Sequence, residues 1–162
     1  MNGMRLARKL GLSCYRSPGE WAERFGRRRT ASIDASGDGF GAEFEVESYL
    51  EHNAAKFAAG FDANCFLYLS RAMDDFDPAE HANGDFQAAF ARLRLERALV
   101  VGVSSDTLFP VAEQRVLADA LEVGCDGDVR FVELGSIQGH DAFLIDEVRF
   151  SPVMRQFFEE LA

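Results

Sequence analysis

The stretch Arg97–Val103 reads RALVVGV and is a nearly continuous apolar run of β-forming residues. A run of this kind is typical of a parallel strand that is buried on both faces. Residues 110–123 follow with helical spacing, residues 129–134 (VRFVEL) alternate like a strand, and residues 151–161 are expected to form a closing helix with Pro152 near its N-terminus. The last third of the chain therefore predicts a βαβα unit with parallel strands and a right-handed crossover.

Helices are predicted for most of the chain before this unit. Apolar residues recur with helical spacing over residues 3–12, 43–76 and 85–95. The tetrapeptide SPGE at 17–20 marks a further helix start, because it offers a serine cap, a proline in the first turn and a glutamate three residues on. Residues 30–41 are rich in Gly, Ser and Asp and are predicted to form a loop.

The longest helical run is expected to break at FDAN, residues 61–64, where Asp62 or Asn64 would cap a second helix. That second helix carries an apolar stripe that includes Cys65, Leu67 and Met73. Such a stripe is typical of a core or of a helix-to-helix contact. We therefore expect Cys65 to be buried.

Composition narrows the class of protein. The chain has 162 residues, 48% hydrophobic and 27% charged, which is enough for one domain or for a piece of a larger one. A net charge of −10 argues against general nucleic-acid binding, and no apolar run is long enough to span a membrane. Residues 1–30 nevertheless carry eight Lys or Arg against two Glu. They form either a site for an anion, such as a phosphorylated cofactor, or a solvated basic face.

Cysteine usage indicates a reducing compartment. Cys14, Cys65 and Cys125 are odd in number, widely spaced and without a CxxC pair, so neither a zinc site nor a disulfide framework is expected. We predict three reduced thiols in a cytoplasmic protein, with Cys125 in a loop and no metal.

Two chemically active residues follow the predicted strands. Asp106 comes just after the first strand and His140 just after the second. Functional groups gather beyond the carboxyl ends of parallel strands, so the two loops should lie close together. An acid followed by a histidine matches the second half of the Ser…Asp…His order of α/β-hydrolases. Taken singly, an Asp after a strand is often a turn or cap residue, and a His after a Gly is often structural.

Several segments in one order carry a family resemblance: LARK (6–9), FEVESYL (44–50), FDAN (61–64), SDTLFP (105–110) and GHDAFL (139–144). With them, nearly the whole chain resembles the homoserine O-acetyltransferase family of α/β-hydrolase-fold amino-acid O-acyltransferases. Residues 6–11 and 64–71 are also similar to its serine O-succinyltransferase branch, so both donors stay open.

The resemblance implies an α/β fold and a two-step acyl transfer. A serine takes an acyl group from acetyl-CoA or succinyl-CoA, and L-homoserine or L-serine then receives it, as in methionine biosynthesis; no bound cofactor is implied. Asp106 and His140 would be the acid and base of the triad. Arg8 and Tyr15 would line the substrate pocket, with Arg8 facing the carboxylate, and Asp141 would face the ammonium. Without the resemblance, Arg8 reads as a surface ion pair and Asp141 as a cap.

The resemblance also divides the chain. Residues 1–95 would be a helical lid region with a pocket-lining N-terminal helix and a homodimer contact through the lid. Residues 96–162 would be the C-terminal βαβα part of the core, which holds the last two parallel strands of an α/β-hydrolase fold.

The family's nucleophile elbow has no counterpart here. Ser136 comes closest, in GSIQG, but this is not Gly-x-Ser-x-Gly and lies too near His140. We therefore expect a C-terminal portion that needs a missing N-terminal half for activity. Two alternatives are a non-catalytic remnant that binds a full-length homologue and another α/β-hydrolase such as an esterase.

Overall fold

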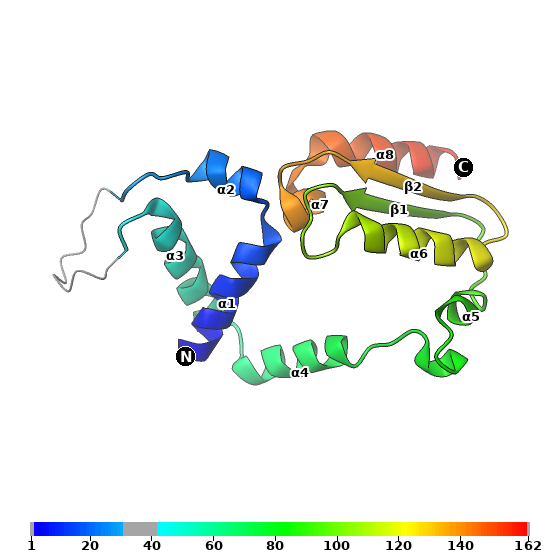
Figure 1. The fold of residues 1–162 in the computed structure, drawn as a ribbon, viewed down its shortest axis with the longest axis horizontal. Coiled ribbons are helices and arrows are strands. Elements are labelled where there is room, and N and C mark those ends of the chain that lie inside the picture. Colours follow the sequence, from blue (N-terminus) through cyan, green and yellow to red (C-terminus); the bar gives the residue numbers. More distant parts are fainter. Residues whose placement is uncertain (1, 31–41, 162) are drawn as a thin grey trace. The chain divides into compact units, whose positions relative to one another are not determined.

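The chain forms two compact units in a computed structural model that describes residues 2–30 and 42–161 (Figure 1). The first unit covers residues 1–74 and the second residues 75–162. The loop predicted at 30–41 lies, except for Thr30, outside the described residues. The boundary between the lid region and the C-terminal core part, predicted between residues 95 and 96, stays a prediction. The compact units divide earlier because the segment that follows residue 75 packs against the sheet unit, through contacts of its short helix with the crossover helix.

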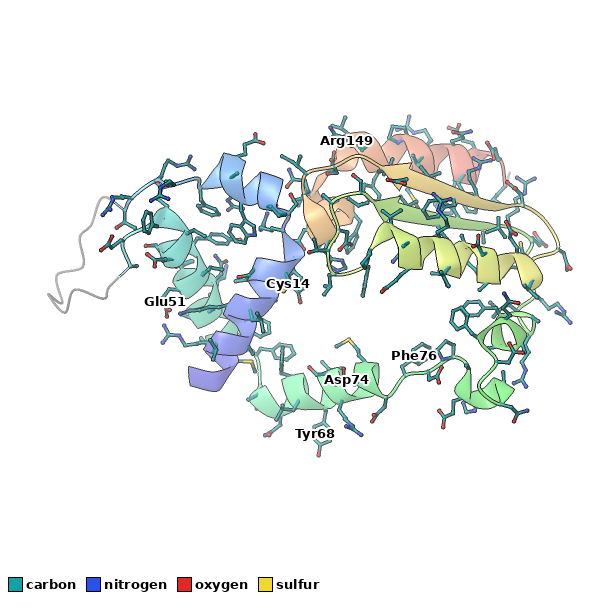
Figure 2. The ribbon with its side chains drawn as sticks, in the orientation of Figure 1. Cys14, Glu51, Tyr68, Asp74, Phe76 and Arg149 are labelled. Carbon is teal, nitrogen blue, oxygen red and sulfur yellow. The ribbon has the colours of Figure 1, made fainter. Side chains whose placement is uncertain are left out.

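The first unit is helical. It contains α1 (Asn2–Tyr15), α2 (Pro18–Arg24), α3 (Glu45–Gly60) and α4 (Ala63–Asp74), and α1 packs along α3. Ser17 caps α2 as predicted, because its Oγ accepts a hydrogen bond of 3.1 Å from the amide of Glu20. Arg5 and Lys9 of α1 both pair with Glu51 of α3, which Figure 2 labels.

The predicted break before α4 is confirmed, and the predicted burial of its stripe is wrong. Asp62 caps α4 by accepting hydrogen bonds of 2.9 Å from the amides of Asn64 and Cys65. Cys65 itself is exposed, as are Leu67 and Met73. No described helix or strand packs extensively along α4, so the stripe is uncovered within the described chain.

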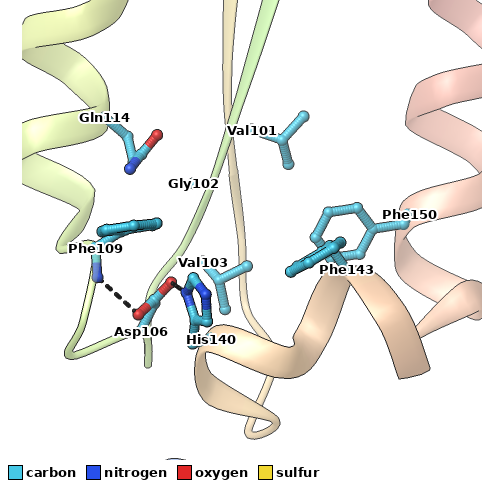
Figure 3. Close-up of a pocket in the computed structure, with 9 residues that line it drawn as sticks. All are labelled: Val101, Gly102, Val103, Asp106, Phe109, Gln114, His140, Phe143 and Phe150. Atoms are coloured by element: carbon cyan, nitrogen blue, oxygen red, sulfur yellow. Dashed lines mark hydrogen bonds and ion pairs between the residues drawn. The ribbon is translucent and has the colours of Figure 1, made fainter. Parts of the chain in front are cut away.

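The second unit contains the predicted parallel sheet. Its elements are η1 (Glu80–Ala82), α5 (Phe86–Phe90), β1 (Ala98–Val103), α6 (Val111–Val123), β2 (Val129–Leu134), η2 (Gly139–Asp141), α7 (Ala142–Ile145) and α8 (Glu147–Glu159). β1 pairs with β2 in parallel, from Ala98 opposite Val129 to Val103 opposite Leu134. α6 packs on both strands, and α8 lies on the other side of the sheet from α6 (Figures 1 and 3).

Two helix boundaries differ from the sequence prediction. The helix expected over 85–95 is the short α5, and the closing helix begins at Glu147, so Pro152 lies inside it. A proline in a helix removes the hydrogen bond to the carbonyl four residues earlier, here that of Val148 in the first turn. The loss is confined to the start of α8, and the helix continues.

A close backbone approach fixes the end of α6. A Cβ on Gly124 would lie 2.0 Å from the carbonyl oxygen of Phe90, so only glycine fits there. Cys125 follows in the predicted loop and forms an isolated bridge with Leu95. This junction holds the segment after α5 beside the turn that leads into β2.

None of the helices in the described ranges is long and apolar enough to cross a membrane.

Candidate functional site

The loops that follow β1 and β2 bring an acid and a histidine into contact. Oδ2 of Asp106 lies 3.0 Å from Nδ1 of His140 (Figure 3). The two side chains are 10% and 20% exposed, so the contact is largely shielded from water. The sequence predicted that these loops would meet, because the strands are parallel neighbours in one sheet.

The carboxylate of Asp106 is held in place from its other side. Its Oδ1 accepts hydrogen bonds from the amides of Leu108 (2.8 Å) and Phe109 (2.9 Å). An ionised carboxylate only accepts hydrogen bonds, so Nδ1 of His140 is the protonated nitrogen in this contact. That tautomer puts the lone pair of the neutral ring on Nε2, the nitrogen that a general base uses.

An apolar cavity of about 290 Å³ lies beside this pair. Its walls include Phe109 and Phe143, whose rings meet the His140 imidazole edge-on at centroid distances of 4.8 and 6.0 Å (Figure 3). The other lining residues are Val101, Gly102, Val103, Gln114 and Phe150. The aromatic rings fix the plane of the imidazole and reduce its hydration.

The aromatic walls of this cavity were not predicted from the sequence. Both phenylalanines stand within three residues of the acid or the histidine, in SDTLFP and GHDAFL. Proximity to the acid and the histidine is the signal that would have found them.

Arg8 and Tyr15 meet in the first unit. The Arg8 guanidinium lies 5.6 Å from the Tyr15 ring centroid and 4.7 Å from that of Phe57. Arg8 also lines a cavity of about 360 Å³ with Asn53, Lys56, Phe57, Gly60 and Phe61. Its Nε is buried without a hydrogen-bond partner, and no described carboxylate pairs with it. The ion-pair alternative for Arg8 therefore does not apply within the described residues.

Asp141 directly follows His140 in the second unit. It is half-buried at the end of η2, and its side chain makes no capping hydrogen bond to α7. Asp106, His140 and Asp141 thus belong to one unit, and Arg8 and Tyr15 to the other. Across the described ranges, no three His, Cys, Asp or Glu side chains cluster in a way that could hold a metal ion.

Sequence comparison finds close relatives. The chain is 54% identical over 160 residues to a serine O-succinyltransferase of Stenotrophomonas maltophilia, which covers 99% of this chain and 43% of the relative. It is 53% identical over 156 residues to a serine O-succinyltransferase of Litchfieldella anticariensis, covering 96% of this chain and 42% of the relative. The chain therefore spans less than half the length of these relatives. No family model matches it.

Solved structures share its fold. A homoserine O-acetyltransferase from Bacillus anthracis superposes with a TM-score of 0.77 at 19% identity, over 96% of this chain and 40% of that one. Esterase E22 superposes with a TM-score of 0.74 at 22% identity, over 96% of this chain and 42% of that one. The fold is thus part of an α/β-hydrolase fold, as the sequence predicts. By sequence, nearly the whole chain is thus similar to part of serine O-succinyltransferases at about half identity. By fold, it is similar to part of the two solved structures.

Proposed function

We propose that the chain supplies the acid and base of an amino-acid O-acyltransferase that moves an acyl group from acyl-CoA to a hydroxy-amino acid. The single observation that carries this proposal is the contact between Asp106 Oδ2 and His140 Nδ1 at the ends of neighbouring parallel strands. Acyl transfer to a hydroxyl needs a base that removes the proton and returns it, and this pair is arranged for that task.

In the first step, a serine hydroxyl from outside the described chain attacks the thioester carbonyl. His140 Nε2 takes the hydroxyl proton, the carbon–sulfur bond breaks, and the proton passes to the departing CoA thiolate. Asp106 keeps Nδ1 protonated and stabilises the imidazolium while it exists. The products of this step are an acyl-serine ester and free CoA.

In the second step, the hydroxyl of the acceptor attacks the acyl-serine. His140 Nε2 removes the acceptor proton and returns a proton to the serine oxygen as the ester bond breaks. The serine is regenerated and the O-acyl amino acid leaves. No bound cofactor takes part, since acyl-CoA is a co-substrate.

Charged side chains would hold the zwitterionic acceptor. Arg8 would bind its carboxylate, which is consistent with a buried Nε that has no partner in the described chain. Tyr15, beside the guanidinium, would line the same pocket. Asp141, next to His140, would accept from the ammonium.

Two donors and two acceptors are compatible with this chemistry. The sequence resemblance leaves both acetyl-CoA and succinyl-CoA, and both L-homoserine and L-serine, open. Two relatives that are about half identical to this chain over nearly its whole length are named serine O-succinyltransferase. Their name favours succinyl-CoA and L-serine. The acceptors differ by one methylene, so few pocket residues need to change between them.

The nucleophile would come from the part of the relatives that this chain does not span. Large apolar side chains around His140 are exposed: Phe109, Phe143, Leu144, Ile145 and Val148. Exposed large apolar side chains that gather near one site are typical of a buried interface. The exposed side chains of α4 would serve a homodimer contact. Three free cysteines fit a cytoplasmic protein.

The alternative is a non-catalytic chain that binds a full-length homologue through the same surfaces. Co-expression with the part of the Stenotrophomonas maltophilia relative that this chain does not match separates the two. Purified complex would be assayed with L-serine and L-homoserine and with both acyl-CoAs. An enzyme gives turnover that His140→Ala abolishes and His52→Ala, a change at an exposed histidine, retains. A complex that forms without turnover would contradict the enzymatic proposal.

A further inference from the structure

A second set of hydrogen bonds joins the two loops behind the Asp106–His140 contact. The Oγ of Ser105 donates to the backbone carbonyl of Ser136 and accepts a hydrogen bond of 3.1 Å from the amide of Gly139. Ser105 directly precedes Asp106, and Gly139 directly precedes His140. One hydroxyl therefore ties together the backbones that carry the acid and the histidine.

Gly139 makes this arrangement sterically possible. Its φ of 65° lies in the left-handed region, which glycine adopts without the strain that a Cβ brings. The turn at Gly139 directs its amide to Ser105 and sends the next residue, His140, toward Asp106. The hydrogen bond to Ser105 thus fixes the turn from which His140 projects.

The other end of the histidine loop is anchored by a buried pair. Ser136 Oγ donates a hydrogen bond of 2.6 Å to Oδ2 of Asp146 and accepts one of 3.2 Å from the amide of Gln138. Arg149 of α8, labelled in Figure 2, donates to the same carboxylate oxygen at 2.8 Å. Ser136 and Asp146 are 4% and 8% exposed, so water competes little for these bonds.

We propose that Ser105, with the buried Ser136–Asp146 pair, positions His140 against Asp106 and so selects the ring tautomer with its lone pair on Nε2. None of these three residues lines the cavity beside the imidazole, and the two serines form hydrogen bonds to the loop backbone, so the three act through that backbone. The catalytic meaning of this role rests on the proposed function. The role itself is a property of the folded chain and is measurable without substrate.

The test is the tautomer ratio of His140 in the full chain, measured by ¹H–¹⁵N correlation of its imidazole above the pH at which the ring titrates. Wild type is expected to hold the Nδ1–H form. Ser105→Ala should lower the ratio of the Nδ1–H to the Nε2–H form by about fivefold, the equilibrium equivalent of one net hydrogen bond. Ser105→Thr keeps the hydroxyl and should restore the wild-type ratio.

The neighbouring Ser104 supplies the matched control. Its side chain is exposed and makes no hydrogen bond among the described residues, so Ser104→Ala should leave the ratio unchanged. An unchanged ratio in folded Ser105→Ala would overturn the proposal.

A measurement on the wild-type chain guards against a variant that does not fold. The amide of Gly139 should be protected from hydrogen exchange, since it donates to Ser105. Exchange at the rate of an unprotected glycine amide would also overturn the proposal. Failure of acyl transfer in the assembled complex would contradict the proposed function but would leave both of these results standing.

Discussion

Asp106 Oδ2 and His140 Nδ1 are 3.0 Å apart, although the two residues are separated by 34 positions in the chain. The parallel register of β1 and β2 causes this proximity, because it ends both strands at the same edge of the sheet. Asp106 accepts from two backbone amides as well as from His140, so the carboxylate has one orientation. A small chemical change at either residue should therefore disturb the contact between Asp106 and His140.

Asp106→Asn should lower the rate of acyl transfer by about 10⁴-fold, the magnitude of the same change in serine protease triads. An amide has one acceptor oxygen. If that oxygen keeps the bonds to the Leu108 and Phe109 amides, the NH₂ group faces Nδ1 and forces the proton onto Nε2. Steady-state turnover of the assembled complex checks this. Asp126→Asn, at an exposed loop carboxylate, is the control, and equal losses in both variants would count against the assigned role.

Arg8→Gln should weaken binding of the amino-acid acceptor by about 10- to 100-fold, since it removes a charge-assisted hydrogen bond to a carboxylate. The effect should fall on KM for the acceptor more than on kcat. Arg5→Gln on the same helix is the control, because Arg5 pairs with Glu51 and exposed pairs contribute little. A wild-type KM in Arg8→Gln would remove Arg8 from the acceptor site.

Gly124→Ala should reduce the free energy of unfolding by about 1–3 kcal/mol, because its Cβ would meet a backbone oxygen that cannot move aside without shifting α5. Thermal or urea unfolding of the chain measures the change. Gly135→Ala is the matched control, since an added Cβ there meets no atom within 4 Å. Equal stability of the two variants would show that the segment after α5 is not packed as described.

Low pH should weaken the interactions of Asp146 with Ser136 and Arg149. The hydrogen bond from Ser136, followed by the interaction with Arg149, lowers the pKa of Asp146 from its ordinary value of 3.8. A lowered pKa in the folded state contributes stability that is present above 3.8 and is lost as the pH falls through the lowered value. Asp146→Asn should therefore flatten the acid side of a plot of unfolding free energy against pH, whereas Glu147→Gln should not. Parallel wild-type and Asp146→Asn curves would refute this linkage.

The sheet and the acid–histidine contact could be predicted because they depend on local patterns and on strand order. RALVVGV and VRFVEL are unambiguous strands, and parallel neighbours leave few places for the loops that follow them. The caps at Ser17 and Asp62 were similarly predictable, since each bonds to amides within three residues.

The burial of α4, the start of α8 and the hydrogen bonds behind the acid–histidine contact depend on contacts that the sequence pattern does not specify. The stripe on α4 shows that one face is apolar but not what covers it, which is why Cys65 was misplaced. The predicted start of α8 was too late because a proline is typical of a helix start. In the structure Pro152 lies in the early turns of α8, where the helix tolerates the loss of one hydrogen bond. The Ser105 and Ser136–Asp146 bonds join loops across the sheet edge, and nothing local distinguishes these serines from Ser104.

In the proposed reaction, His140, held by Asp106, is the base that loads an acyl group onto a serine of the part that this chain does not span. Intact-protein mass spectrometry of the assembled complex, shortly after mixing with succinyl-CoA and without acceptor, tests it most directly. The co-expressed part of the Stenotrophomonas maltophilia relative should gain the mass of one succinyl group with the wild-type chain and should gain none with His140→Ala. Equal loading with His140→Ala, or loading of this chain itself, would contradict it.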